Sequence, residues 1–347
     1  MAKIANKSSE SKAFASKTML NILNAGLHTL LDDSLHLKTH PIQTDHFLND
    51  QLQNGQLQRK ALKTKPLQSK QSHAHIPLET KRDFINEVSQ RYGASALLCI
   101  GIGVKQFIDS PVGRALLNGS DPFLLLKKWQ RLERYVHSQH FVDFEYHDDC
   151  VKVTHKSSTT EPPSIEEDLA VLGVLCALLY ESSARKIVIS HSLKASEGFF
   201  SYPSLQCNAS QLHRDAPWYI HFQVSENTNP RIKNAEQSVT NNTLSVVNMA
   251  KQAIMDLGLL EVDLQQVSRC LALSPRSLQR KLSDEGHSFA KLLQDVRVHF
   301  ASQSLLNEAS CIAEVGFVSG FADQAHFTRV FKQWTGMSPK QYTQFKS

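Results

Sequence analysis

The stretch SGFADQAHFTRVFKQWTGMSP near the end of the chain joins hydrogen-bonding side chains to an apolar helical face. The hydrogen-bonding side chains stand on the early turns of the expected helix: Gln324, His326, Thr328 and Arg329. The apolar residues recur on its other side: Phe327, Val330, Phe331 and Trp334. The amide of Gln and the guanidinium of Arg match the edges of adenine and guanine in the major groove. The pattern therefore predicts a helix that reads DNA, although an ordinary capped surface helix is compatible with these residues alone.

The residues before this helix predict how it begins. CIAEVGFVSGF has the pattern of a short helix that ends at Gly320, where glycine permits a left-handed turn. Asp323 stands where an N-cap is expected, because its carboxylate can accept from the first backbone N–H groups of the helix. Helix, tight turn and capped second helix predict a helix-turn-helix, whose second helix enters the major groove.

A second copy of this arrangement lies upstream in DLQQVSRCLALSPRSLQRKLSDEG. Ser274 is expected at the N-cap of its second helix and Pro275 at the first helical position, which is a strong start signal. The outward face of that helix carries Arg276, Gln279 and Arg280. Between the two copies, SFAKLLQDVRVHFASQSLL has apolar residues at helical spacing and predicts one long helix that ties the motifs together.

The first 224 residues predict a mixture of helices and strands. DPFLLLKKWQRLERYVHS predicts a helix capped by Asp121, and IEEDLAVLGVLCALLYESSA predicts one that begins with a capping box of Ser164 and Glu167. HFVDFEYHDD and CVKVTH have the pattern of a β-hairpin, and KIVIS predicts a further strand. The run MLNILNAGLHTLLDD predicts a pair of helices broken at Gly26, and GIGV from Gly101 predicts a packed strand.

These patterns predict a multidomain fold, in which an α+β N-terminal domain precedes an all-α C-terminal domain with two helix-turn-helix motifs joined by a linker helix. The expected boundaries are a disordered tail over 1–17, an effector-binding and dimerisation domain over 18–224 with a flexible insertion near 51–76, a linker over 225–243, and a DNA-binding domain over 244–347. The insertion and the linker are expected to be flexible because they are polar and lack periodicity.

The composition limits the class of protein. With 347 residues, of which 41% are hydrophobic, the chain can form two or three domains with real cores. Its net charge of +5 is compatible with a nucleic-acid partner without requiring one. Residues 261–347 hold ten Lys or Arg and eight Asp or Glu, so DNA binding there would depend on a few well-placed cations and not on bulk charge.

The six cysteines show no CxxC pair and no Cys/His spacing typical of a zinc site. Several stand inside apolar runs, which favours buried free thiols over a metal or redox role and suits a reducing compartment. No apolar run is long enough to span a bilayer, and the N-terminus lacks the apolar core of a secretory signal. We therefore expect a cytoplasmic protein with no metal, no cofactor and no membrane partner.

The two motifs and their connecting helix closely resemble the DNA-binding domain of the AraC/XylS family of bacterial transcription regulators. The resemblance rests on ALSPRSLQRKL in the first motif and GFADQAHFTRVFKQWTGMSPKQY in the second, and it covers roughly Leu244 to Phe345. It departs from the family at Gly316, where the family usually has Ala and where a helical glycine is expected to cost up to about 1 kcal/mol. The resemblance implies a transcriptional regulator that reads two successive major grooves, and we expect it to act as an activator.

The resemblance also implies roles for individual residues. The base-reading positions fall on Arg276, Gln279, Arg280, Gln324, Ala325, His326 and Arg329. Ala325 cannot donate a hydrogen bond, although its methyl group can contact the methyl group of thymine. Phosphate contacts, which position the protein without reading sequence, are expected at Ser274, Ser277, Lys281, Thr328 and Lys332. The implied partners are double-stranded DNA, RNA polymerase, a small-molecule effector and a second copy of the chain.

Upstream, NAGLHTLLDD and the region from DPFLLLKKWQ to CVKV resemble more weakly the N-terminal effector domain of the branch that includes ornithine-utilisation regulators. This resemblance does not identify the effector. Four residues in or next to the helix of this region are candidates to line an effector pocket: Trp129, Arg131, Tyr135 and His137. Trp129 would suit the core of the domain equally well.

The alternative function is an enzyme fused to a DNA-binding module. Some DNA-repair alkyltransferases join an AraC-like module to a nucleophilic cysteine and a four-cysteine zinc site. In this chain Cys207 stands in LQCNAS, without the Pro-Cys-His-Arg context of that nucleophile. A hydrolase would need a nucleophile, a base and an orienting acid, and the first 230 residues show no recognisable set. We therefore expect no catalytic residues.

Overall fold

The computed structural model describes residues 14–36, 75–119, 121–137, 139–213, 216–225, 245–306 and 311–345. Most of the expected tail, of the insertion near 51–76 and of the linker over 225–243 lies outside these ranges. The disorder and flexibility expected for those segments therefore stay predictions.

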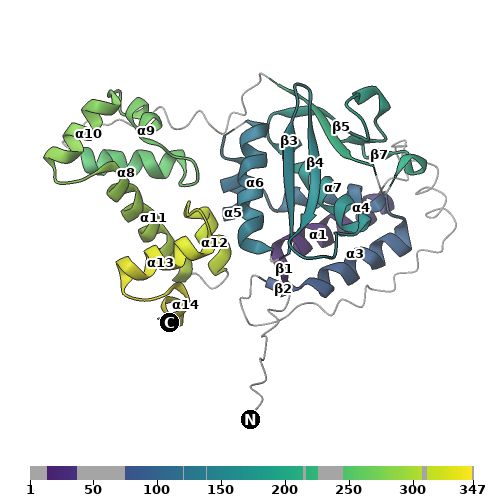
Figure 1. The fold of residues 1–347 in the computed structure, drawn as a ribbon, viewed down its shortest axis with the longest axis horizontal. Coiled ribbons are helices and arrows are strands. Elements are labelled where there is room, and N and C mark those ends of the chain that lie inside the picture. Colours follow the sequence, from purple (N-terminus) through teal and green to yellow (C-terminus); the bar gives the residue numbers. More distant parts are fainter. Residues whose placement is uncertain are drawn as a thin grey trace, which may run out of the picture.

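The chain forms an α+β N-terminal domain and an all-helical C-terminal domain, which confirms the predicted fold class (Figure 1). The helices of the N-terminal domain are α1 (Lys17–His36), α3 (Leu78–Tyr92), α4 (Ala96–Cys99), a 3-10 helix (Ile100–Gln106), α5 (Pro111–Leu117), α6 (Pro122–Val136) and α7 (Ile165–Glu181). Its strands are β1 (Phe14–Ser16), β2 (His75–Pro77), β3 (His140–Tyr146), β4 (Cys150–Ser157), β5 (Ala184–Ser190), β6 (Phe200–Tyr202), β7 (Gln206–Cys207) and β8 (Trp218–Val224).

The main sheet is antiparallel, with the strand order β3-β4-β8-β5-β6-β7. The predicted hairpin is its β3–β4 pair, with His140 opposite Ser157 and Tyr146 opposite Val151. Helix α7 packs on β5 and on the 3-10 helix, and most of its residues are buried. This burial on all sides explains why the sequence of α7 is apolar around its whole circumference.

The predicted helix starts of this domain are confirmed. At α7, Ser164 Oγ accepts from the N–H of Glu167 at 3.2 Å, and Glu167 Oε2 accepts from the N–H of Ser164 at 3.1 Å, which is a complete capping box. At α6, the Asp121 carboxylate accepts from the N–H of Phe123 at 2.8 Å. Both caps satisfy backbone N–H groups that a helix leaves without intrahelical partners.

Two predictions made from glycines are wrong. Helix α1 runs without a break through Gly26, and GIGV from Gly101 lies in the 3-10 helix and not in a strand. A Cβ atom added at Gly26 would lie 1.7 Å from the carbonyl oxygen of Ile100, and one added at Gly103 would lie 2.0 Å from that of Ile22. The glycines are there because α1 and the 3-10 helix cross with their backbones in contact, which no local pattern reveals.

The N-terminal domain also orders residues that the sequence assigns to flexible segments. β1 lies within the expected tail and β2 at the end of the expected insertion, and the two strands pair antiparallel with Ala15 opposite Ile76. Because the strands are antiparallel, α1 and α3 begin at opposite ends of this strand pair. β1 and β2 therefore pack with the N-terminal domain, and the expected domain boundaries stay predictions.

A group of titratable side chains is buried where α3, β3 and α7 meet. Glu167 Oε1 lies 3.8 Å from Lys81 Nζ and 3.3 Å from His140 Nδ1, and none of the three residues is more than 3% exposed. The neighbouring Asp168 accepts a hydrogen bond from Trp218 Nε1 at 3.0 Å. Buried charges are tolerated when they are paired, so this group ties α7 to α3 and to the sheet.

The C-terminal domain consists of the helices α8 (Val246–Leu257), α9 (Leu264–Cys270), α10 (Pro275–Asp284), α11 (Phe289–Leu306), α12 (Ile312–Val318), α13 (Gln324–Thr335) and α14 (Pro339–Tyr342). Two apolar cores lie in it, one around α9 and α10 and the other around α13. Helix α11 contributes Leu292 and Val296 to the first core and Val298 and Ala301 to the second. It is therefore the predicted linker helix.

In the described ranges, no single helix is long and apolar enough to cross a membrane. One bent pair, Ala96–Gln106 with Pro111–Leu117, reaches the required length and hydropathy only when both helices are counted, and they meet at 102°.

Candidate nucleic-acid interface

The first motif consists of α9, a short turn and α10. Ser274 Oγ accepts from the N–H of Ser277 at 3.1 Å, and Pro275 occupies the first helical position, as the sequence predicts. On the inner side of α10, Leu278 and Leu282 are fully buried in the core shared with α8 and α11. The packing of these two leucines fixes which face of α10 points outward.

The outer face of α10 carries the predicted base-reading residues of this motif. Arg276, Gln279 and Arg280 are all exposed, and in the described part of the chain none of them has a hydrogen-bond or ion-pair partner. Lys281 is exposed beside them. Four donors of this kind on one helical face can contact base edges and phosphates.

The second motif consists of α12, a glycine turn and α13. Gly320 has a φ of 81°, and a Cβ atom there would lie 2.0 Å from the carbonyl oxygen of Leu259. The turn therefore needs glycine for its left-handed backbone and for its contact with the chain ahead of α9. Asp323 is the N-cap of α13 and accepts from the N–H of His326 at 2.7 Å.

The inner face of α13 is held by aromatic packing. Phe327, Val330 and Phe331 are at most 5% exposed. The ring of Phe327 lies 5.0 Å from that of Phe321 and 5.5 Å from that of Phe331, measured between centroids. Trp334 is half-buried at the edge of this core. The apolar face seen in the sequence is therefore the face that fixes α13.

The outer face of α13 presents Ala325, Arg329 and Lys332, all of which are exposed. Gln324 is half-buried, and its Oε1 is buried without a partner in the described part of the chain. The Thr328 hydroxyl donates to the carbonyl oxygen of Gln324 at 2.9 Å, so its proton is engaged while its oxygen can still accept. The outer face thus combines one guanidinium, one ammonium and one methyl group.

His326 stands between the turn and Arg329. Burial is the main cause that lowers the pKa of its imidazole, and the charge of Arg329 adds to this effect. Its Nδ1 accepts from the N–H of Ala322 at 3.4 Å, so the neutral ring carries its proton on Nε2. His326 can therefore offer one N–H donor to an acceptor such as guanine N7 or thymine O4 at neutral pH.

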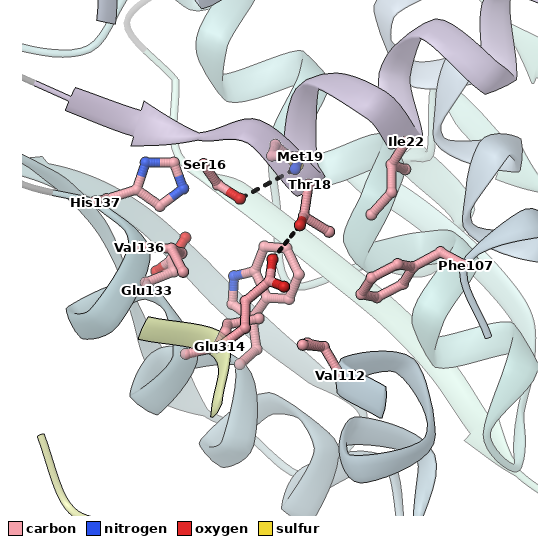
Figure 2. A pocket seen from close by; sticks show the side chains of 12 residues that line it. Ser16, Thr18, Met19, Ile22, Phe107, Val112, Glu133, Val136, His137 and Glu314 are labelled. Carbon is pink, nitrogen blue, oxygen red and sulfur yellow. Dashed lines mark hydrogen bonds between the residues drawn. The ribbon is translucent and has the colours of Figure 1, made fainter. Parts of the chain in front are cut away.

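The four effector candidates divide into two pairs. Trp129 and His137 line a small cavity between α1, α5 and α6, and Glu314 of α12 also lines it (Figure 2). Glu133 also lines it, and the enclosed part has room for little more than a water molecule. Arg131 and Tyr135 contact the C-terminal domain instead. The sequence contained no signal for either arrangement, because both depend on how the two domains meet.

None of the six cysteines forms a disulfide, and Cys270 is the exposed one of the six. Cys207 is buried in β7. Among the described residues, no group of three or more His, Cys, Asp or Glu side chains is placed to hold a metal ion.

Comparison with known proteins places the strongest similarity in this C-terminal region. Residues 267–344 match the family model described as a helix-turn-helix domain. The ornithine utilization regulator of Pseudomonas aeruginosa is 40% identical over 80 residues, which are 23% of this chain and 24% of that protein. The HTH-type transcriptional regulator AdiY of Escherichia coli is 32% identical over 80 residues, or 23% and 32% of the two chains. The match thus spans about a quarter to a third of the length of these relatives.

Two solved structures are also similar to this chain. The transcriptional regulator CdpR from Pseudomonas aeruginosa covers 78% of this chain and 92% of its own, with 18% identity and a TM-score of 0.30. A DNA-binding transcriptional dual regulator from Escherichia coli K-12 covers 31% of this chain and 97% of its own, with 25% identity and a TM-score of 0.29.

Proposed function

We propose, on the premise that residues 267–344 form an AraC-type helix-turn-helix domain, that the chain is a sequence-specific DNA-binding transcriptional regulator. The observation that carries this proposal is the pair of capped helices α10 and α13, each with a buried apolar face and an exposed face of Arg, Gln or Lys. Both helices are anchored on α11. Such a pair can read two successive major grooves, about 34 Å apart on one face of the duplex.

In this proposal the exposed side chains have two kinds of task. Arg276, Gln279 and Arg280 in the first motif and Arg329 in the second contact base edges, and His326 donates from Nε2. The phosphate contacts are made by Ser274, Ser277, Lys281, Thr328 and Lys332. Gln324 must turn its half-buried amide outward before it can read a base, because its Oε1 is buried in the free chain.

The first test separates reading from positioning on α13. Arg329→Ala should flatten the preference at one or two base pairs, since a bidentate contact from Arg contributes about 1–3 kcal/mol of discrimination. Lys332→Ala should weaken binding to all sequences alike and lower the salt slope by about one. The measurement is the affinity for an operator and its single-base variants at several salt concentrations.

Both residues are exposed, so neither substitution should change the unfolding transition. If Arg329→Ala weakens binding uniformly and every base preference survives, Arg329 is a phosphate contact and the reading role of α13 is wrong.

We also propose that the N-terminal domain binds a small organic effector and mediates dimerisation, and that RNA polymerase is a partner of the DNA-bound form in the cytoplasm. An α+β domain joined to a DNA reader is most simply a ligand-controlled switch. Trp129 and His137 are the candidates that face a cavity, although a metabolite would have to widen it.

We expect a thermal-shift screen of amino acids and small metabolites to find compounds that raise the melting temperature. If no compound stabilises the chain or changes its DNA affinity, regulation is independent of an effector.

A further inference from the structure

The N-terminal domain shares its core with the second motif. Leu260, Ala313, Phe317 and Val318 of the C-terminal domain belong to the same apolar cluster as the core of the N-terminal domain. Helix α12 packs on α5 and α6, whereas Val315 on its other side belongs to the core around α13. Helix α12 supports α13 in the motif, and part of the packing around α12 therefore comes from side chains of the N-terminal domain.

Gly316 explains how closely the two domains approach. A Cβ atom at this position would lie 3.0 Å from Cε1 of Tyr135 on α6 and 2.7 Å from Cδ1 of Phe327 on α13. The ring of Tyr135 also meets the ring of Phe317 edge to face, 6.2 Å between centroids. Position 316 therefore needs glycine because α12 packs closely against both α6 and α13. This packing offsets the low helix propensity of glycine.

Two polar side chains of α6 bind the turn of the second motif. Arg131 Nε and Tyr135 Oη both donate to the carbonyl oxygen of Phe321, at 3.0 and 2.9 Å. Arg131 Nη1 also donates to the carbonyl oxygen of Leu260, ahead of the first motif, at 3.0 Å. One guanidinium thus joins the N-terminal domain to the second turn and to the segment that leads into α9. Near the start of α12, the Thr18 hydroxyl of α1 donates to Glu314, which Figure 2 shows as a dashed line.

This docking leaves the reading faces uncovered. Arg329 and Lys332 on α13 and Arg276 on α10 are exposed while the two domains are in contact. Separation of the domains would instead expose Phe317 and Val318 to water and leave α12, a helix of seven residues, with one supported side. In the docked arrangement, therefore, the N-terminal domain does not bury these three side chains.

We propose that the N-terminal domain completes the second helix-turn-helix motif, with Arg131 and Tyr135 as positioning residues that hold the turn ahead of α13. This inference rests on the proposed function. It makes the domain interface a control point for the second half-site, because any change that loosens α6 from α12 releases α13 from its reading position while α10 keeps its own core.

The test uses the full chain and an operator selected by the wild type from random duplexes. Base pairs whose substitution no longer changes the affinity of Arg329→Ala belong to the second half-site. Base pairs whose substitution no longer changes the affinity of Gln279→Ala belong to the first half-site. Arg131→Ala should then lose at least about tenfold in affinity for the full operator, because it removes charge-assisted hydrogen bonds to two carbonyl groups. On DNA whose second half-site is scrambled, it should bind within about twofold of the wild type. Tyr135→Phe should lose a few fold in affinity for the full operator and, likewise, little on the scrambled duplex. It replaces Arg131→Ala in the test if that variant fails to fold.

The matched control is Arg134→Ala, which removes the same charge from an exposed position of the same helix and should bind both duplexes like the wild type. Hydrogen exchange of residues 312–318 should be faster in Arg131→Ala than in this control. The inference is overturned if Arg131→Ala and Tyr135→Phe bind both duplexes like the wild type, or if they lose equally on both. If the wild type selects no sequence at all, the proposed function fails instead.

Discussion

Replacing Phe327 with alanine should lower the free energy of unfolding of the second motif by about 3–5 kcal/mol, the usual cost of emptying a buried Phe site. Phe327 is fully buried, and its ring contacts those of Phe321 and Phe331. The core around α13 is small, so the neighbouring rings have few partners with which to close the cavity. We therefore expect the whole motif to loosen, and base preference in the second half-site to be lost with it.

The measurement is chemical denaturation of the full chain, combined with hydrogen exchange of residues 311–345. Phe141→Ala is the matched control, because Phe141 lies on the edge strand β3 and is 39% exposed. That substitution should change the unfolding free energy by about 0.5 kcal/mol or less. A cost for Phe327→Ala no larger than the cost for Phe141→Ala would show that this core does not hold α13.

The local structure of the two helix-turn-helix motifs could be predicted from the sequence because it depends on short-range chemistry. Ser274 and Asp323 cap the helices they were expected to cap, and Gly320 has the left-handed backbone expected of it. Each of these features involves residues within a few positions of one another. The same is true of the α7 capping box, and the β3–β4 hairpin pairs two strands that follow each other directly in the sequence.

The contacts between distant segments could not be predicted in this way. The local pattern predicts a helix break at Gly26 and a packed strand at Gly101, yet the roles of these glycines depend on Ile100 and on α7, which approach them from other parts of the chain. Arg131 and Tyr135 are pocket candidates in the sequence because they stand in a helix that resembles the family's effector domain, which does not tell what packs against them. The sequence indicates which face of α6 is polar, but only the docked domains show that this face binds a carbonyl group of the second motif.

The second large effect concerns Glu133, whose carboxyl group should make stability fall as the pH rises. Burial raises its pKa from the ordinary value of 4.5 to about 7, although the N–H of Val142, 2.7 Å from Oε2, favours the charged form. An acid whose pKa is higher in the folded state stabilises the fold fully below its unfolded pKa, and loses that contribution as the pH rises through its folded pKa. Each pKa unit corresponds to about 1.4 kcal/mol, so the loss between pH 4.5 and pH 7 should reach about 3 kcal/mol.

Glu133→Gln removes this titration while keeping an oxygen that can accept from Val142. We therefore expect the variant to gain about 3 kcal/mol over the wild type on going from pH 4.5 to pH 8, measured by urea denaturation at each pH. His155 acts in the opposite direction, because burial lowers the pKa of its imidazole and stability is lost as the pH falls below 6.5. Both proteins contain His155, so the difference between them isolates Glu133. A difference between Glu133→Gln and the wild type that is equal at pH 5 and pH 8 would mean that Glu133 is ionised throughout and that its burial is compensated by contacts beyond Val142.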